Sequence, residues 1–342
     1  MKEGIDEMNS RIRIREIAVY HPSNKVNTDF YIEHFAKQKK DVEHLLRDIY
    51  GKENRYIIQN EGKSANEREN SLTMQIEAAK MVLKKSNLTG ADIDGIIVTT
   101  QFPEYLGPPS FMWVHKAIDA KSDCFGYDLN ANCVGMVLAL EQAMKNMMQD
   151  DKINRLLIVG GDYMTLGISK NDANVYGVFG DAACAIILER TTEESGLIEA
   201  SHFMNNIPIN YIRFPVCGLS EMIEHNNPNI LSYQMEQPSS DVPVILETIT
   251  NMLERNHLTI SDINGFCFSQ SVKALYNKLT EKLGIPLEKC PYVGDRYGYT
   301  GSTSPFLALN ELIEQEKIKH GDYVLFWTFG AAMQHIFLLI RY

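Results

Sequence analysis

Cys133 is the residue whose surroundings best suit covalent chemistry. It lies in the segment Asp128-Leu129-Asn130-Ala131-Asn132-Cys133-Val134-Gly135-Met136, where an apolar strand is predicted to end and a helix to begin. A thiol at a helix N-terminus faces the positive end of the helix dipole and unpaired backbone N–H groups, which lower a thiol pKa. The segment therefore predicts a thiolate that attacks an acyl thioester. The plain alternative is a structural cysteine in a strand–helix turn.

The remaining cysteines and the histidines offer no comparable site. The other cysteines are scattered, without the short spacings of a zinc or CxxC site, and we expect them to be reduced and buried: Cys124, Cys184, Cys217, Cys267 and Cys290. We predict no metal. Three histidines of the second half are candidates for a catalytic base, although packing or surface roles fit each of them better: His202, His225 and His335.

A second turn of interest, Gly298–Ser304, emerges from an internal repeat. Leu88–Gly95 (LTGADIDG) returns 170 positions later as Leu258–Gly265 (LTISDING), and Val137–Glu141 corresponds to Phe306–Glu311 at nearly the same offset. Two matches in the same order indicate a duplicated unit, with chance similarity of short helices as the alternative. This alignment places Ser302 opposite Cys133, so a twofold arrangement would bring both helix starts to a shared centre. The turn lacks the lysine and spacing of a nucleotide-phosphate loop.

The elements that must hold these residues alternate between strands and helices. We predict buried strands at Gly95–Thr100, Cys124–Leu129, Arg155–Gly160 and Tyr323–Thr328, and helices at 67–86 and 134–148. One face of the first helix is predicted to gather Met74, Ile76, Ala79, Met81, Val82 and Leu83. The alternation indicates an α/β fold of two similar halves on a pseudo-twofold axis. The predicted halves are residues 10–192, which carry the nucleophile, and 193–342, divided at the polar stretch Thr191–Ser195.

Composition argues against several classes of protein. The 342 residues include 33 Lys+Arg and 44 Asp+Glu, a net charge of −11, which disfavours nucleic acid as a partner. No apolar run approaches the roughly 18 residues of a membrane span. The polar start, Met1–Glu7, is unlike a signal peptide. We expect a cytoplasmic protein that does not bind membranes.

Together these motifs resemble the ketoacyl-acyl-carrier-protein synthase III family of the thiolase superfamily, from about Ile12 to Tyr342. The matching pieces are the Cys133 turn, Phe179-Gly180-Asp181-Ala182-Ala183, Gly298–Ser304 and Phe329-Gly330-Ala331-Ala332, with weaker matches at Pro109-Ser110 and Gly51…Arg55. The resemblance implies a homodimer of five-layered α-β-α-β-α subunits. It also implies an acyltransferase of fatty acid or related acyl-chain biosynthesis, which uses acyl-CoA or acyl carrier protein thioesters as substrates and binds no cofactor permanently.

The same resemblance assigns site residues. Cys133 matches the family nucleophile, and its N–H with that of Ala331, where the family usually has Gly, would form the oxyanion hole. Ser269, in Phe266–Ser271, occupies the slot of the family His, and Tyr299 occupies that of the family Asn. Each can donate one hydrogen bond, but neither carries a proton near neutral pH as imidazole does. We therefore expect Cys133 to be acylated, and malonyl condensation to be slow or to use a different nucleophile.

Substrate and partner contacts are expected in three regions. The stretch Asn27–Ile58 matches the family's coenzyme A clasp but has no Trp; its aromatic residues include Phe30, Tyr31 and Tyr50. Tyr163–Leu166 replaces an Arg that some members place near the coenzyme, so a carrier-bound donor is favoured. A basic patch for an acidic acyl carrier protein, or only a solvated helix face, would comprise Lys273, Lys278, Lys282 and Arg296. Phe111–Trp113 would line an acyl tunnel or a subunit contact.

A non-enzymatic alternative uses the same residues. The chain could be an impaired partner subunit that stabilises an active homologue in a heterodimer. The changes at Ser269 and Tyr299 favour this interpretation, whereas the intact turn around Cys133 opposes it. Hydroxymethylglutaryl-type condensation lacks an evident acidic base here, and chalcone-type enzymes retain the family His and Asn.

Overall fold

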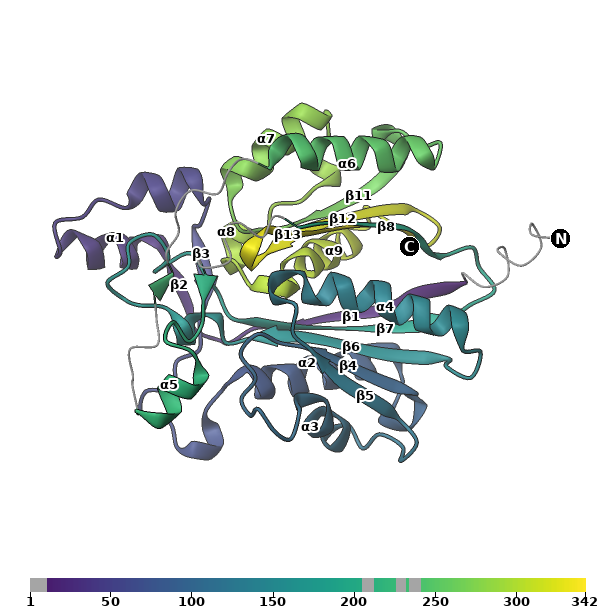
Figure 1. Ribbon diagram of the computed structural model, residues 1–342, viewed down its shortest axis with the longest axis horizontal. Helices are drawn as coiled ribbons and strands as arrows, with labels where there is room; N and C mark the ends of the chain where they lie inside the picture. The colour runs from purple at the N-terminus through teal and green to yellow at the C-terminus, as the bar shows by residue number, and fades with distance from the viewer. Residues whose placement is uncertain (1–10, 205–211, 226–231, 234–240) are drawn as a thin grey trace.

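Two β-sheets alternate with three layers of helices in this chain (Figure 1). The computed structural model describes residues 11–204, 212–225, 232–233 and 241–342. Figure 1 shows the order of layers: α2 and α3, the first sheet, α4 and α9, the second sheet, then α6 and α7. Separate apolar clusters fill the spaces between successive layers. The expected five-layered α-β-α-β-α arrangement is confirmed.

The first sheet has the strand order β1-β7-β6-β4-β5. Strand β4 runs parallel to both β5 and β6, whereas β7 is antiparallel to β6 and to β1. The bounds are β1 Ile12–Tyr20, β4 Gly95–Thr99, β5 Phe125–Leu129, β6 Arg155–Asp162 and β7 Ala182–Arg190. The parallel strands place their carboxyl ends, and the loops that follow, at one edge of the sheet.

The second sheet repeats these relations in the order β11-β12-β13-β8. Strands β11 and β12 are parallel, and β12–β13 and β13–β8 are antiparallel, as are the pairs β6–β7 and β7–β1. The bounds are β8 Gly196–Met204, β11 Ile263–Phe268, β12 Tyr323–Gly330 and β13 Gln334–Arg341. The same order and directions in both sheets support the duplication.

The repeated LT…D-I segments fold alike. Thr89 and Thr259 each begin a single 3-10 turn in a capping box, with backbone angles of −118°, 169° and −120°, 169°. In each copy the side chain of the third residue, Asp92 or Asp262, accepts from the threonine backbone N–H and hydroxyl. A helix precedes each turn and a buried strand follows it. Because this capping box is formed by a threonine and an aspartate three residues apart, the same residue types occur in both halves.

The helices form the three remaining layers. Helices α4 and α9 lie between the sheets and are apolar over most of their surface, as their position requires. The bounds are α2 Ser71–Ser86, α3 Ser110–Ala117, α4 Gly135–Gln149, α6 Val242–Arg255, α7 Lys273–Leu283 and α9 Ser304–Glu314. None of the described helices is long and apolar enough to cross a membrane.

Shorter elements cover the edge of the sheets where the parallel strands end. They are β2 Lys25–Asn27, α1 Thr28–Ala36, a π-helical turn Leu45–Ile49, β3 Asn54–Tyr56, β9 Ile212–Arg213, α5 Leu219–Glu224, β10 Ser232–Tyr233 and α8 Gly294–Tyr297. A fourth apolar cluster joins α1 and the π-helical turn to Phe179 and Tyr299 and contacts Cys133. This cap lies over the candidate site.

Two sequence predictions need correction. The segment predicted as a buried strand at 124–129 forms strand β5 from Phe125 to Leu129, and this strand is only partly buried because it is the outer strand of its sheet. The helix predicted over 67–86 begins at Ser71, capped by Asn70. Its buried face excludes Met81, which is exposed, and buries Met74 and Val82 as predicted.

The division of the chain at residues 192 and 193 remains a prediction. This position lies between β7 and β8, the last strand of the first sheet and an outer strand of the second. The predicted start at residue 10 and the polar segment Met1–Glu7 lie outside the described residues.

Candidate active site

The turn between β5 and α4 holds Cys133. Asn132 adopts a left-handed conformation (φ 51°) and begins one turn of 3-10 helix, Asn132–Val134, before α4 starts at Gly135. Asp128 does not face the thiol, because its carboxylate accepts the backbone N–H groups of Ser110 and Phe111 and caps α3. The sequence therefore places the cysteine at a helix start, as predicted.

Two polar side chains contact the Cys133 sulfur. Gln101 Nε2 lies 3.7 Å from Sγ, and Gln101 Oε1 lies 4.0 Å from it. The Tyr299 side chain also hydrogen-bonds the thiol. Cys133 keeps part of its surface exposed, so it is not sealed within the core. The sulfur therefore has donors that can stabilise negative charge beside it.

The protonation state of Cys133 differs from the prediction. Burial, together with the charge of Asp162, raises the pKa of the thiol to about 11, although hydrogen bonds from Tyr299 and Gln101 lower it. Desolvation outweighs the helix start and these donors. The prediction of a lowered pKa is therefore wrong for the free protein, in which Cys133 is a thiol at neutral pH.

Asp162 fixes the position of Gln101. Its Oδ1 accepts from Thr100 Oγ1 at 2.7 Å, from Gln101 N at 2.7 Å and from Phe102 N at 3.0 Å. Its Oδ2 lies 3.4 Å from Gln101 Nε2. Because Asp162 is fully buried, desolvation raises its pKa. The last residue of β6 thus holds the loop after β4 against the thiol.

Close backbone approaches position Tyr299. Its N–H donates to Val178 O at 2.9 Å, and its carbonyl accepts from Gly180 N at 3.1 Å. Gly298 has φ 73°, and a Cβ there would lie 2.9 Å from Gly180 N. The two glycines of the sequence motifs therefore let the chain segments meet behind Tyr299.

The end of β12 approaches the Cys133 backbone. Thr328 Oγ1 lies 3.5 Å from the Cys133 carbonyl oxygen. A Cβ at Gly330 would lie 3.4 Å from the Cys133 backbone nitrogen. The following residues leave the strand through a turn in which Ala332 has φ 59°. The turn containing Ala331 therefore lies beside the Cys133 N–H, although the role of Ala331 as an oxyanion donor stays a prediction.

The serines of the site are buried. Ser269 follows β11, its N–H donates to Trp327 O at 2.8 Å, and its hydroxyl pairs with Ser271 at 3.3 Å. Ser302 sits in the 3-10 turn before α9, as Cys133 does before α4. A Cβ at Gly135 would lie 4.0 Å from the Ser302 Cβ, so the two helix starts meet as the repeat predicts.

The candidate bases have other partners. His335 is buried, with Nε2 3.2 Å from Asp241 Oδ2, and its ring stacks on Phe329 and Phe337. Burial lowers its pKa. His202 and His225 pair with glutamates: Glu141 at 3.0 Å and Glu221 at 3.1 Å. These contacts favour packing and surface roles.

The cysteines away from the site are mostly buried. Four are buried as predicted: Cys124, Cys184, Cys267 and Cys290. Cys217 is partly exposed, which corrects the prediction for that residue. The described residues contain no group of three or more His, Cys, Asp or Glu arranged to hold a metal ion.

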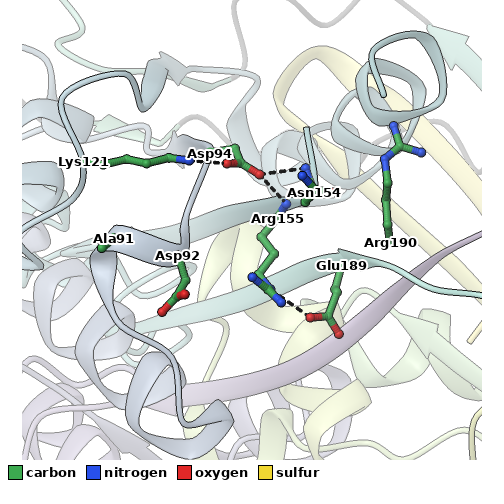
Figure 2. Close-up of a pocket in the computed structure, with 8 residues that line it drawn as sticks. All are labelled: Ala91, Asp92, Asp94, Lys121, Asn154, Arg155, Glu189 and Arg190. Atoms are coloured by element: carbon green, nitrogen blue, oxygen red, sulfur yellow. Dashed lines mark hydrogen bonds and ion pairs between the residues drawn. The ribbon is translucent and has the colours of Figure 1, made fainter. Parts of the chain in front are cut away.

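A charged surface pocket lies at the opposite edge of the first sheet (Figure 2). It opens beside the first residues of β4 and β6, whereas Cys133 follows the carboxyl end of β5. Asp94 pairs with Lys121 at 2.5 Å, and Arg155 pairs with Glu189 at 2.8 Å. These groups neutralise one another, so the pocket contains paired structural charges rather than a second site.

The predicted substrate regions differ in accessibility. Tyr31 and Tyr50 are buried, and Tyr31 lies against Arg55, so only Phe30 of the named aromatic residues is exposed.

In the predicted basic patch, the Lys273 ammonium lies 5.6 Å from the centre of the Tyr292 ring. Arg296 pairs with Glu311 at 2.8 Å. Phe111 packs against the first sheet, whereas Met112 and Trp113 are exposed.

Sequence reasoning missed Gln101 and Asp162. Both residues are at or just after the carboxyl ends of parallel strands β4 and β6, next to the loop after β5 that holds Cys133. Side chains at such strand ends commonly form sites in α/β folds, and this topological rule could have found them.

Comparison with known proteins gives a consistent result. The pattern of "3-Oxoacyl-[acyl-carrier-protein (ACP)] synthase III" matches residues 127–206, and that of its C-terminal part matches 253–342. The beta-ketoacyl-[acyl-carrier-protein] synthase III of Coxiella burnetii is 28% identical over 322 residues, which cover 94% of this chain and 96% of the relative.

Solved structures show the same fold. The 3-oxoacyl-[acyl-carrier-protein] synthase III of Aquifex aeolicus superposes with a TM-score of 0.80 at 23% identity, covering 97% of this chain and 100% of the other. That of Pseudomonas aeruginosa gives a TM-score of 0.83 at 18% identity, covering 97% and 98%.

Proposed function

This chain belongs to the ketoacyl-acyl-carrier-protein synthase III family, and we propose that it is an acyltransferase that condenses an acyl group with a malonyl thioester in acyl-chain biosynthesis. The observation that carries the proposal is Cys133 at the start of α4, with Gln101 and Tyr299 in contact with its sulfur. An acyl-CoA or acyl carrier protein thioester supplies the acyl group. No permanently bound cofactor is part of this proposal.

The first half-reaction transfers the acyl group to Cys133. The sulfur attacks the thioester carbonyl, a new Cys133 thioester forms, and the donor's carbon–sulfur bond breaks. The thiol proton leaves with the donor's thiol, so the exchange needs no net base even though Cys133 is protonated in the free protein. The backbone N–H groups of Cys133 and Ala331 would stabilise the tetrahedral oxyanion.

The second half-reaction is expected to be slower than in family members with His and Asn. By the resemblance Ser269 and Tyr299 occupy those two slots. Tyr299 contacts the thiol, whereas the Ser269 hydroxyl is turned to Ser271. A site without an imidazole must stabilise the malonyl-derived enolate by hydrogen bonds alone.

A carrier protein is the proposed macromolecular partner. The exposed Lys278 and Lys282 and the partly exposed Lys273 lie on α7, which follows Ser269 and thus begins near the site. A basic helix face suits an acidic carrier. We predict that Lys273→Glu weakens binding of malonyl-acyl carrier protein several-fold in a titration, while Gln315→Glu, a charge change on the surface near the end of α9, does not. Unchanged affinity of Lys273→Glu would favour the solvated-face interpretation.

The outer strand of the first sheet supports the proposal of a homodimer. Its outer strand β5 carries the exposed Phe125, and the neighbouring α3 carries the exposed Met112 and Trp113. An outer strand flanked by exposed apolar side chains suits pairing with a second copy of this chain.

A cytoplasmic location stays a prediction. The heterodimer alternative gains no support from the relatives, which are named as synthases.

Intact-mass measurement tests the proposed function. Incubation of the protein with acyl-CoA, and separately with acyl carrier protein thioesters, is expected to add one acyl group, which is absent in Cys133→Ala. Malonyl-acyl carrier protein should then remove this group slowly as a ketoacyl product. Failure of wild-type protein to gain the acyl mass would refute the proposal, and rapid malonyl turnover would refute the slow second step.

A further inference from the structure

Gln101 offers the site an amide that none of the sequence motifs supplies. Its Nε2 lies 3.7 Å from the Cys133 sulfur, the atom that would carry the acyl group. Tyr299 hydrogen-bonds the same sulfur from the turn before α9. Two donors from separate chain segments therefore converge at this point.

Asp162 determines which end of the Gln101 amide is a donor. A carboxylate only accepts hydrogen bonds, so Nε2 rather than Oε1 faces Asp162 Oδ2, at 3.4 Å. The backbone N–H of Gln101 donates to the other oxygen of the same carboxylate at 2.7 Å. The second N–H of the amide faces the sulfurs of Cys133, at 3.7 Å, and Met164, at 3.8 Å.

Gly301 leaves room for this amide. It has φ 67°, and a Cβ there would lie 3.1 Å from Gln101 Nε2. The Met164 sulfur lies 3.8 Å from the same nitrogen and closes another side. Gly301 and Met164 therefore confine the amide on two sides, next to the thiol.

We propose that Gln101, together with Tyr299, donates hydrogen bonds to the carbonyl oxygen of the malonyl thioester as it becomes an enolate. This inference rests on the proposed function. The attacking carbon must come within about 3–3.5 Å of the acyl carbon before the bond forms. The enolate oxygen, attached to the neighbouring carbon, then lies near the Cys133 sulfur and within reach of the groups that contact it.

The chemical step balances with these residues. The malonyl carbon–carboxylate bond breaks and releases carbon dioxide, and its electron pair forms the enolate. The enolate carbon attacks the acyl carbonyl on Cys133, a carbon–carbon bond forms, and the Cys133 carbon–sulfur bond breaks. The resulting Cys133 thiolate takes a proton from water. Gln101 is thus a catalytic residue for the second half-reaction, while Asp162 is a positioning residue.

Gln101→Met tests this role, because methionine has a similar length and no N–H donor. We expect condensation to fall by about 10²-fold, as for loss of one oxyanion donor, and acylation of Cys133 to fall much less than condensation. Gln75→Met is the matched control: the buried Gln75 amide donates to Gly161 O at 2.7 Å, outside the site. This control should lower Tm while leaving the ratio of the two rates unchanged.

A second readout removes any contribution from the thiol. In Cys133→Ala, malonyl thioester that loses carbon dioxide is protonated on carbon to acetyl thioester, which mass spectrometry quantifies. Adding Gln101→Met should reduce acetyl formation by a similar factor. Condensation within threefold of wild type, or an equal fall in acylation and condensation, would overturn the role of Gln101. A wild-type protein that is never acylated would instead refute the proposed function itself.

Discussion

The raised pKa of Cys133 predicts slow alkylation that accelerates with pH. With a pKa of about 11, the thiolate fraction at pH 7 is about 10⁻⁴. An ordinary cysteine with a pKa of about 8.5 is roughly 3% thiolate at that pH. The higher intrinsic nucleophilicity of a more basic thiolate recovers about tenfold of this difference. Iodoacetamide should therefore modify Cys133 about 20- to 30-fold more slowly than a cysteine in a short peptide.

Labelling as a function of pH measures this directly. Peptide-resolved mass spectrometry after iodoacetamide treatment at pH 7, 8 and 9 follows Cys133 separately from the partly exposed Cys217. The rate at Cys133 should rise about tenfold with each pH unit, without a plateau, while Tm shows that the protein stays folded. Asp162→Asn removes a negative charge that raises the thiol pKa, so this variant should label faster at pH 7.

A different pH dependence of Cys133 labelling would contradict this prediction. Labelling of Cys133 that is fast at pH 7 and constant above pH 8 would mean that the helix start and the donors outweigh desolvation. In that case the free protein would hold a thiolate at Cys133, as its position at a helix start predicts, and desolvation would not determine the thiol pKa. A Cys133→Ser variant confirms that the followed peptide is the correct one.

Two further predictions concern residues that support the site or the fold. Gly301→Ala places a Cβ 3.1 Å from Gln101 Nε2 in a left-handed conformation, so it should cost about 1–2 kcal/mol of stability, measured by denaturant unfolding, and slow condensation; unchanged values would contradict the close fit. Burial lowers the pKa of His335, so the folded state disfavours its protonated form and stability should fall as pH drops below about 6.5. His335→Phe should show a smaller decrease of Tm between pH 7.5 and 5.5, and an equal decrease would refute this origin.

Local chemistry made much of the fold predictable. The Thr-x-x-Asp capping boxes at Thr89 and Thr259 have the same backbone angles because the same side chains satisfy the same orphan N–H groups. The mostly apolar residues of β5 predict a buried strand. Burial also depends on the neighbouring strands, and the sheet order leaves β5 outermost. Sequence alone carries no signal for that position in the sheet.

The candidate site was predictable only where a motif carried it. Cys133 and Tyr299 lie in recognisable turns, and the structure brings their side chains into contact. Gln101 belongs to no motif, and its proximity to the sulfur follows from the parallel pairing of β4 with β5. The thiol pKa was mispredicted because desolvation is a property of the assembled layers, which a nine-residue segment does not report.

The pairing of distant strands determines when each half can fold during synthesis. Strand β1 pairs with β7, Ile12 opposite Arg190, so the first sheet waits for its final strand to leave the ribosome. Strand β8 is hydrogen-bonded to β13, with Gly196 opposite Arg341. The second sheet therefore cannot close before β13 has left the ribosome, and a nascent chain must keep β8 and the edge of β12 that pairs with β13 unpaired or chaperoned until then.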